Sequence, residues 1–114
     1  MASPAQQSIG VRADERRGSR RYPIMLDLAF KLRCGRRIER GSGKTRELSS
    51  RGVLIKTDAK LPAGAHIELS IAWPIVLNED AGLNLYVTGQ VVRTEDGLSA
   101  VRFIRYVFRV CARR

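Results

Sequence analysis

The sequence predicts an all-β protein, a small antiparallel barrel of about six strands. Apolar residues recur at every second position in several runs, which is the period of a strand with one buried face. Turn signals separate these runs at short intervals, and no segment longer than a turn or two has the apolar period of a helix. Because a barrel closes its own edges, it suits so short an all-β chain.

Length and composition indicate one folded domain. The chain has 114 residues, of which 44% are hydrophobic and 28% charged, as in ordinary globular proteins. No stretch approaches the ~18 consecutive apolar residues of a membrane span, and the N-terminus lacks the apolar core of a signal peptide. We therefore expect a cytoplasmic protein in which Cys34 and Cys111 are reduced, with a single disulfide as the alternative.

The first predicted strand begins at Tyr22, where alternation starts abruptly after a segment with no apolar period. Residues 1–20 are rich in Ser, Gln, Gly and Arg and predict a flexible, basic N-terminal arm. The positions that alternate in the first strand are Ile24, Leu26, Leu28, Phe30 and Leu32. Cys34 and Gly35 predict a turn, and the charged, glycine-interrupted segment 36–46 predicts an exposed hairpin strand.

Two short strands are predicted in the middle of the chain. Residues 52–57 are rich in β-branched side chains, and residues 67–71 alternate between apolar and polar after a turn signal at 61–64. Trp73 and Pro74 are expected to end the second of these strands, because proline has no N–H for the ladder. Residues 74–83 are then expected to form a loop.

The last two strands are predicted at residues 85–94 and from Leu98 to about Tyr106, joined by a hairpin turn at Asp96-Gly97. The expected organisation is an arm over residues 1–20, a barrel over 21–108, and a basic tail over 109–114 with little or no C-terminal helix.

The charge distribution predicts an anionic partner. The formal net charge is +10, and residues 1–51 hold 13 of the 21 basic residues but only 5 of the 11 acidic ones. Nucleic acid, an anionic membrane surface, an acidic protein or a phosphorylated small ligand would each fit this excess. Most of the cations are arginines, whose planar fork binds phosphate bidentately and stacks on flat rings, so phosphate or guanine recognition is favoured.

The first functional motif lies where the arm meets the first strand, in residues 15–23. Its four guanidinium groups exceed the local carboxylates, which are Asp14 and Glu15. Such a cluster on a flexible arm could close over a bound anion, and the alternative is a solvated basic tail. The four arginines are Arg16, Arg17, Arg20 and Arg21.

The second motif is the segment from Glu47 to Gly52, directly before a predicted strand. Ser49 and Ser50 can bond backbone groups and shape a turn. Gly52 would permit a positive φ or a close backbone approach to a ligand. Glu47 could accept hydrogen bonds from the N–H edge of a guanine, or it could pair with Arg17, Arg21 or Arg46 and close the site. Taken alone, the segment also reads as an ordinary loop.

In this order, and with this strand pattern, the two motifs resemble those of the PilZ domain family: RxxxR on an N-terminal segment, then D/N-x-S-x-x-G at the surface of a six-stranded barrel of the split-barrel type. Arg17 and Arg21 match the first motif, and Ser49 and Gly52 match the second, while Glu47 stands where the family has Asp or Asn. The resemblance runs from about Glu15 to Tyr106.

The resemblance implies binding of cyclic di-GMP, a bacterial second messenger with two phosphates and two guanines. By analogy, Arg17 and Arg21 would contact phosphate and guanine, with Arg16 and Arg20 adding charge or contacts. Ser49 would hold a guanine or phosphate oxygen, and Gly52 would let the loop approach the ligand.

The sequence leaves three functional hypotheses. The leading one is a cyclic di-GMP sensor and adaptor that changes its surface and so regulates a partner protein. The second is a PilZ-like interaction module without a nucleotide ligand. The third is a small basic barrel that binds nucleic acid. The low aromatic content argues against this function, because aromatic side chains that could stack on bases make up only 6% of the residues. We expect no catalytic role, cofactor or metal, because His66 is the single histidine and no nucleophile–base pair is apparent.

Overall fold

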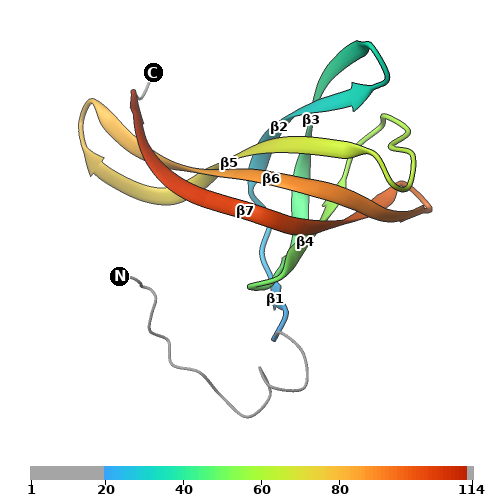
Figure 1. Cartoon of the computed structure of the whole chain (residues 1–114). Coiled ribbons are helices and arrows are strands. Elements are labelled where there is room, and N and C mark those ends of the chain that lie inside the picture. The colour runs from blue at the N-terminus through green and yellow to red at the C-terminus, as the bar shows by residue number, and fades with distance from the viewer. Residues whose placement is uncertain (1–19, 113–114) are drawn as a thin grey trace.

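The computed structural model describes residues 20–112, and all of its regular structure is antiparallel β-sheet (Figure 1). The predicted arm, apart from Arg20, and the last two residues of the predicted tail lie outside the described residues. Among residues 20–112 no helix has the length and apolarity that a membrane span requires. The all-β fold class predicted from the sequence is confirmed.

Seven strands follow one another along the described chain and form one sheet in the order β1-β3-β2-β5-β6-β7-β4. A further pairing of β3 with β4 brings the two sides of the sheet together, so the sheet closes in a ring. The strands are β1 (Tyr22–Pro23), β2 (Asp27–Cys34), β3 (Arg37–Leu48), β4 (Gly52–Lys56), β5 (His66–Asn78), β6 (Ala81–Glu95) and β7 (Leu98–Ala112).

The core lies inside this ring and follows the predicted alternation. On β2 the side chains of Leu28, Phe30 and Leu32 are buried, whereas Ala29 and Arg33 between and after them are exposed. Inward residues of β4, β5, β6 and β7 complete the same cluster. The prediction that period-two alternation marks the buried face is therefore confirmed.

The first predicted strand is interrupted, however, between β1 and β2. The buried hydroxyl of Thr45 on β3 donates to the Ile24 carbonyl oxygen at 2.6 Å and accepts from the Leu26 N–H at 2.8 Å. A shift in the β3–β4 register follows Thr45. A side chain thus replaces part of the backbone ladder here, which alternation alone does not reveal.

Two strand boundaries were predicted wrongly. β5 does not end at Pro74 but continues to Asn78, and a tight turn at Glu79–Asp80 replaces most of the predicted 74–83 loop. Pro74 is tolerated because it falls in a register gap between Trp73 and Val76, beyond the last β5 residue that pairs with β2. Likewise β7 continues past Tyr106 to Ala112, since β6 pairs with it as far as Ala81.

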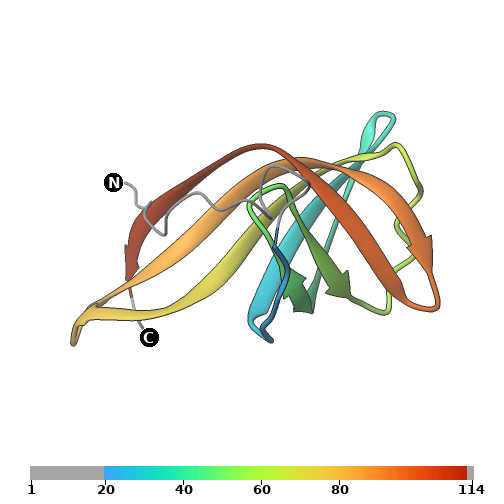
Figure 2. The same cartoon turned by 90° about the horizontal axis from the view of Figure 1, so that it is seen from below.

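Other local predictions are confirmed. Asp96 and Gly97 join β6 to β7 with φ values of 55° and 78°, the left-handed conformation of a two-residue hairpin turn. The segment 36–46 pairs with β2 as a hairpin. Both cysteines are free. Figure 2 shows β5, β6 and β7 arching together beyond the rest of the ring.

Candidate functional site

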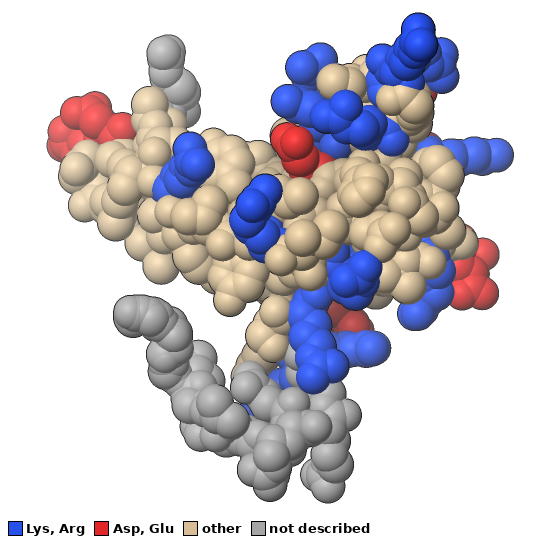
Figure 3. Space-filling view, in the orientation of Figure 1, with Lys and Arg blue, Asp and Glu red and all other residues tan. Residues whose placement is uncertain are grey.

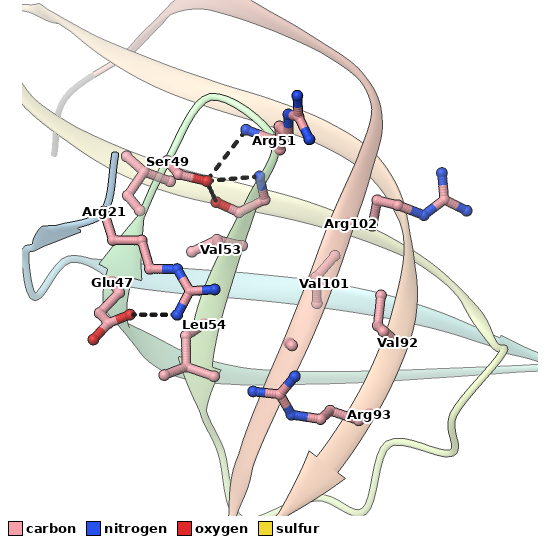
Figure 4. Close-up of a pocket in the computed structure, with 13 residues that line it drawn as sticks. Arg21, Glu47, Ser49, Arg51, Val53, Leu54, Val92, Arg93, Val101 and Arg102 are labelled. Atoms are coloured by element: carbon pink, nitrogen blue, oxygen red, sulfur yellow. Dashed lines mark hydrogen bonds and ion pairs between the residues drawn. The ribbon is translucent and has the colours of Figure 1, made fainter. Parts of the chain in front are cut away.

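A groove with a volume of about 230 Å³ lies on the outer surface of β4, β6 and β7, beside the start of β1 (Figure 4). Four arginines and one glutamate line it, together with apolar and small residues. This excess of positive charge suits an anionic ligand. The charged lining residues are Arg21, Arg51, Arg93, Arg102 and Glu47.

Strand register brings these side chains together. Directly paired residues on neighbouring strands project to the same face of a sheet, and here that face points outward, because the adjacent Val53 and Ile55 are buried. The first row across β3, β4, β7 and β6 is Glu47, Leu54, Ala100 and Arg93. The next row across β4, β7 and β6 is Gly52, Arg102 and Gln90.

A bulge in β6 supplies an apolar part of the groove. The β6–β7 register shifts between Val91 and Arg93, so Val92 has no residue opposite it. Its side chain is 50% exposed and lines the groove. An apolar surface next to guanidinium groups can receive a flat, partly apolar ring such as a nucleobase.

Ser49 shapes the turn between β3 and β4. Its hydroxyl donates to the Gly52 carbonyl oxygen and accepts from the N–H groups of Arg51 and Gly52, each at 3.2 Å. Its own N–H donates to the Gly52 carbonyl oxygen at 2.9 Å. The predicted turn-forming role of Ser49 is thus confirmed, and these bonds hold the Arg51 backbone at the edge of the groove.

Gly52 does not have a positive φ, contrary to one of its two predicted roles. A Cβ added there would collide with the backbone carbonyl oxygen of Val101 on β7. The close backbone approach at Gly52 is therefore to the neighbouring strand. It lets β4 pair with β7 at the point where the turn meets the groove.

Arg21 and Glu47 form the ion pair that the sequence offered as an alternative. The Arg21 Nη1 lies 4.0 Å from the Glu47 Oε1, and the two side chains are 74% and 43% exposed. The pairing of Pro23 with Glu47 brings the start of β1 to this position. Such an exposed pair at the limit of contact distance contributes roughly 0–1 kcal/mol, so a ligand can displace it at little cost.

The remaining arginines differ in their surroundings. The Arg102 Nη2 donates to the Gln90 Oε1 at 2.6 Å, and the Gln90 amide in turn donates to the Gly64 carbonyl oxygen at 3.1 Å, so Arg102 is held in place. Within residues 20–112 neither the Arg51 nor the Arg93 guanidinium has a hydrogen bond or ion pair. Both groups are available to a ligand.

The structure places part of the predicted site together. Arg21, Glu47, Ser49 and Gly52 all line the groove. Arg20 is exposed and is not among the lining residues, and Arg16 and Arg17 lie outside the described residues.

The sequence alone did not predict that Val92, Arg93 and Arg102 line the groove. The Asp96-Gly97 turn was a usable signal for one of them. Counting back along both strands from that hairpin puts Arg93 opposite Ala100.

Thr45→Val is expected to weaken both the fold and the site. Valine keeps the shape but leaves the Ile24 carbonyl and the Leu26 N–H without their partner, at about 1–3 kcal/mol. Because these bonds tether the chain just after Arg21, ligand affinity should fall as well. Thr57→Val is the matched control, since the Thr57 hydroxyl is similarly buried and donates to the Ser42 carbonyl at 2.8 Å, away from the groove.

Urea unfolding and calorimetry would measure the two variants. We expect the two variants to lose comparable stability. Ligand affinity should fall only in Thr45→Val. Equal ligand affinity in both variants would contradict the positioning role of Thr45.

Comparison with known proteins agrees with the fold. A solved structure that resembles this chain is described as the crystal structure of the PilZ domain of CeSA from a cellulose-synthesizing bacterium. The two share 19% sequence identity with a TM-score of 0.55, over 76% of this chain and 82% of that chain. No curated protein matches the chain in sequence. The family model for the PilZ domain matches residues 14–109, from the arginine motif to the far part of β7, and the chain therefore belongs to the PilZ domain family.

Proposed function

We propose that this protein binds cyclic di-GMP in the β4–β6–β7 groove and acts as an adaptor that presents a changed surface to a partner protein. The observation that carries the proposal is the convergence, in one groove, of Arg21, the Ser49 turn and the two unpaired guanidinium groups of Arg51 and Arg93. Family membership supports the choice of ligand, because PilZ domains are a family of cyclic di-GMP receptors.

The ligand's chemistry corresponds to the groove's parts. Its phosphates need guanidinium forks, which Arg51 and Arg93 offer without first breaking another bond. A guanine plane can lie against Val92 and stack on a guanidinium group. Once Arg21 turns to the ligand, the Glu47 carboxylate is free to accept from the N1–H and N2–H₂ edge of a guanine.

The size of the groove supports a role for the arm. At about 230 Å³ it is smaller than the roughly 300–1,000 Å³ of typical ligand pockets. A dinucleotide therefore needs a second wall, and the arm with Arg16 and Arg17 precedes Arg21 directly in the chain. Closure of the arm over the ligand would remove guanidinium groups from solvent and alter the surface around β1, which a partner protein could recognise.

Isothermal titration calorimetry of the full chain with cyclic di-GMP tests this function. We expect affinity in the roughly micromolar range, about −8 kcal/mol. Arg93→Ala should weaken it about tenfold or more, since a charge-assisted hydrogen bond contributes about 1.5–3 kcal/mol.

Arg33→Ala is the matched control for Arg93→Ala. It removes the same charge from an exposed position on β2, outside the groove, and should bind as the wild type does. Equal loss of ligand affinity in both variants would show that net charge, and not a contact made by Arg93, causes the weakening. No detectable heat with the wild type would instead favour an interaction module without a nucleotide.

A further inference from the structure

The far parts of β5, β6 and β7 form a three-stranded extension whose inner face is apolar. Register places three rows of inward side chains across it, each beginning on β5 and ending on β7. The rows are Leu69, Val87 and Tyr106; Ile71, Leu85 and Phe108; and Trp73, Leu83 and Val110. We call the exposed end of these rows, made by Trp73, Leu83, Tyr106, Phe108 and Val110, the distal apolar face.

This face is continuous with the core but uncovered at its β7 side. The β5 and β6 members of the first two rows are buried, whereas Tyr106, Phe108 and Val110 are 51%, 43% and 65% exposed. Figure 2 shows the cause: the three strands arch beyond β2 and β4, and no other described strand lies beneath them. β2 pairs with β5 only as far as Ile71, and β4 pairs with β7 only as far as Arg102.

The face is also preorganised for packing. The rings of Trp73 and Phe108 meet edge to face with centroids 5.0 Å apart, which joins β5 to β7 across the face. Isolated exposed apolar residues are common, but a contiguous group of this kind marks an interaction surface.

Charge distribution favours a second copy as the occupant. The protein carries a net charge of +10, so like copies repel over most of their surface. None of the three rows that form the distal apolar face contains a charged side chain. The nearby cations belong to the opposite face, where Arg105 pairs in register with Thr88 and the Arg109 guanidinium lies over the Tyr86 ring. Two distal faces can therefore meet without bringing like charges together, and an acidic partner would find no cation there to pair with.

The available area suits a weak, reversible dimer. Tyr106, Phe108 and Val110 are each about half exposed or more, and a half-exposed large side chain leaves roughly 80–100 Å² open. Two copies together therefore bury about 500–600 Å² from these three residues, before Trp73, Leu83 and the rim are counted, which is in the range of weak interfaces below about 1,200 Å².

Residues 1–19 are too polar to provide an equivalent cover. Their only large branched apolar residues are Ile9 and Val11, beside Met1. Fibre-like pairing along the free edge of β7 is opposed by Arg105 and Arg109, which lie on that edge strand.

We propose that the distal apolar face is the interface of a two-fold symmetric homodimer, in which the rows ending in Tyr106, Phe108 and Val110 of one copy pack on those of the other. An isologous contact of this kind closes on itself and forms a dimer rather than a filament. The interface does not include the groove residues, so it is independent of whether cyclic di-GMP binds.

Sedimentation velocity of the full chain without nucleotide tests the dimer across micromolar to submillimolar concentration. The sedimenting mass of the wild type should approach twice the 12.8 kDa of one chain as its concentration rises. Phe108→Asp should be monomeric over the same range, because it buries a charge at the centre of the interface. Val107→Asp is the matched control: Val107 is its neighbour, is 45% exposed and projects to the opposite face, so this variant should remain dimeric.

A second readout follows from Trp73, the single tryptophan of the chain. Its fluorescence emission should shift to shorter wavelength as the wild type dimerises and should not change with concentration in Phe108→Asp. A wild type that is monomeric throughout, or a Val107→Asp variant that dissociates as readily as Phe108→Asp, would overturn the proposal. Dimerisation that appears only after residues 1–19 are removed would overturn it as well, by assigning the face to the arm.

Discussion

Arg21→Ala is expected to weaken cyclic di-GMP binding by about 10–100-fold, the largest effect of a single substitution within the described part of the site. Arg21 is the RxxxR arginine that lies on the groove, and it stands between the arm and the Ser49 turn. Losing one charge-assisted contact costs about 1.5–3 kcal/mol, and about 1.4 kcal/mol corresponds to a factor of ten. Calorimetric titration would measure the change.

Stability should hardly change in the same variant. The Arg21–Glu47 pair is exposed and 4.0 Å long, so its removal costs roughly 0–1 kcal/mol. Arg21→Lys keeps the charge but loses the planar fork, and its affinity should fall between those of the wild type and Arg21→Ala. Wild-type affinity in Arg21→Ala would show that the ligand does not engage this side of the groove.

Gly52→Ala is expected to cause the largest loss of stability among single-methyl changes near the site. The added Cβ would meet the Val101 backbone carbonyl, which cannot rotate away as a side chain can. The β4–β7 pairing must therefore distort, at about 1–3 kcal/mol, a substantial part of the roughly 5–15 kcal/mol that stabilises a small domain. Urea denaturation would show a lower midpoint.

Arg51→Ala is the stability control for Gly52→Ala. Arg51 precedes Gly52 in the same turn and is exposed, so its truncation should change the free energy of unfolding by no more than about 0.5 kcal/mol. If Gly52→Ala unfolded at the same urea concentration as Arg51→Ala, the tight β4–β7 contact would not be what requires glycine at this position.

The parts of the fold that were predictable are those set by local sequence. Leu28, Phe30 and Leu32 alternate with polar or small residues, and the strand they predict is buried on that side. The Asp96-Gly97 dipeptide predicts the hairpin turn between β6 and β7, because it is one of the few residue pairs that readily adopt two successive positive φ values. The Ser49 turn likewise depends on residues only three apart.

The parts that were not predictable depend on pairing between distant strands. Arg102 enters the groove because β7 pairs with β4, and Val92 because a bulge at that position shifts the β6–β7 register. Neither alignment is encoded in the few residues around Arg102 or Val92. The continuation of β5 past Pro74 has the same origin, because proline is acceptable only where the neighbouring strand does not require its N–H.

NMR titration of the ¹⁵N-labelled full chain with cyclic di-GMP would show which part of the surface binds the ligand. If cyclic di-GMP binds in the groove, the largest amide shifts should occur in three described segments, 47–52, 92–93 and 100–102, together with shifts at Arg16 and Arg17 of the arm. Shifts confined to the opposite end of the ring, around residues 57–62, with the arm amides unchanged, would contradict it.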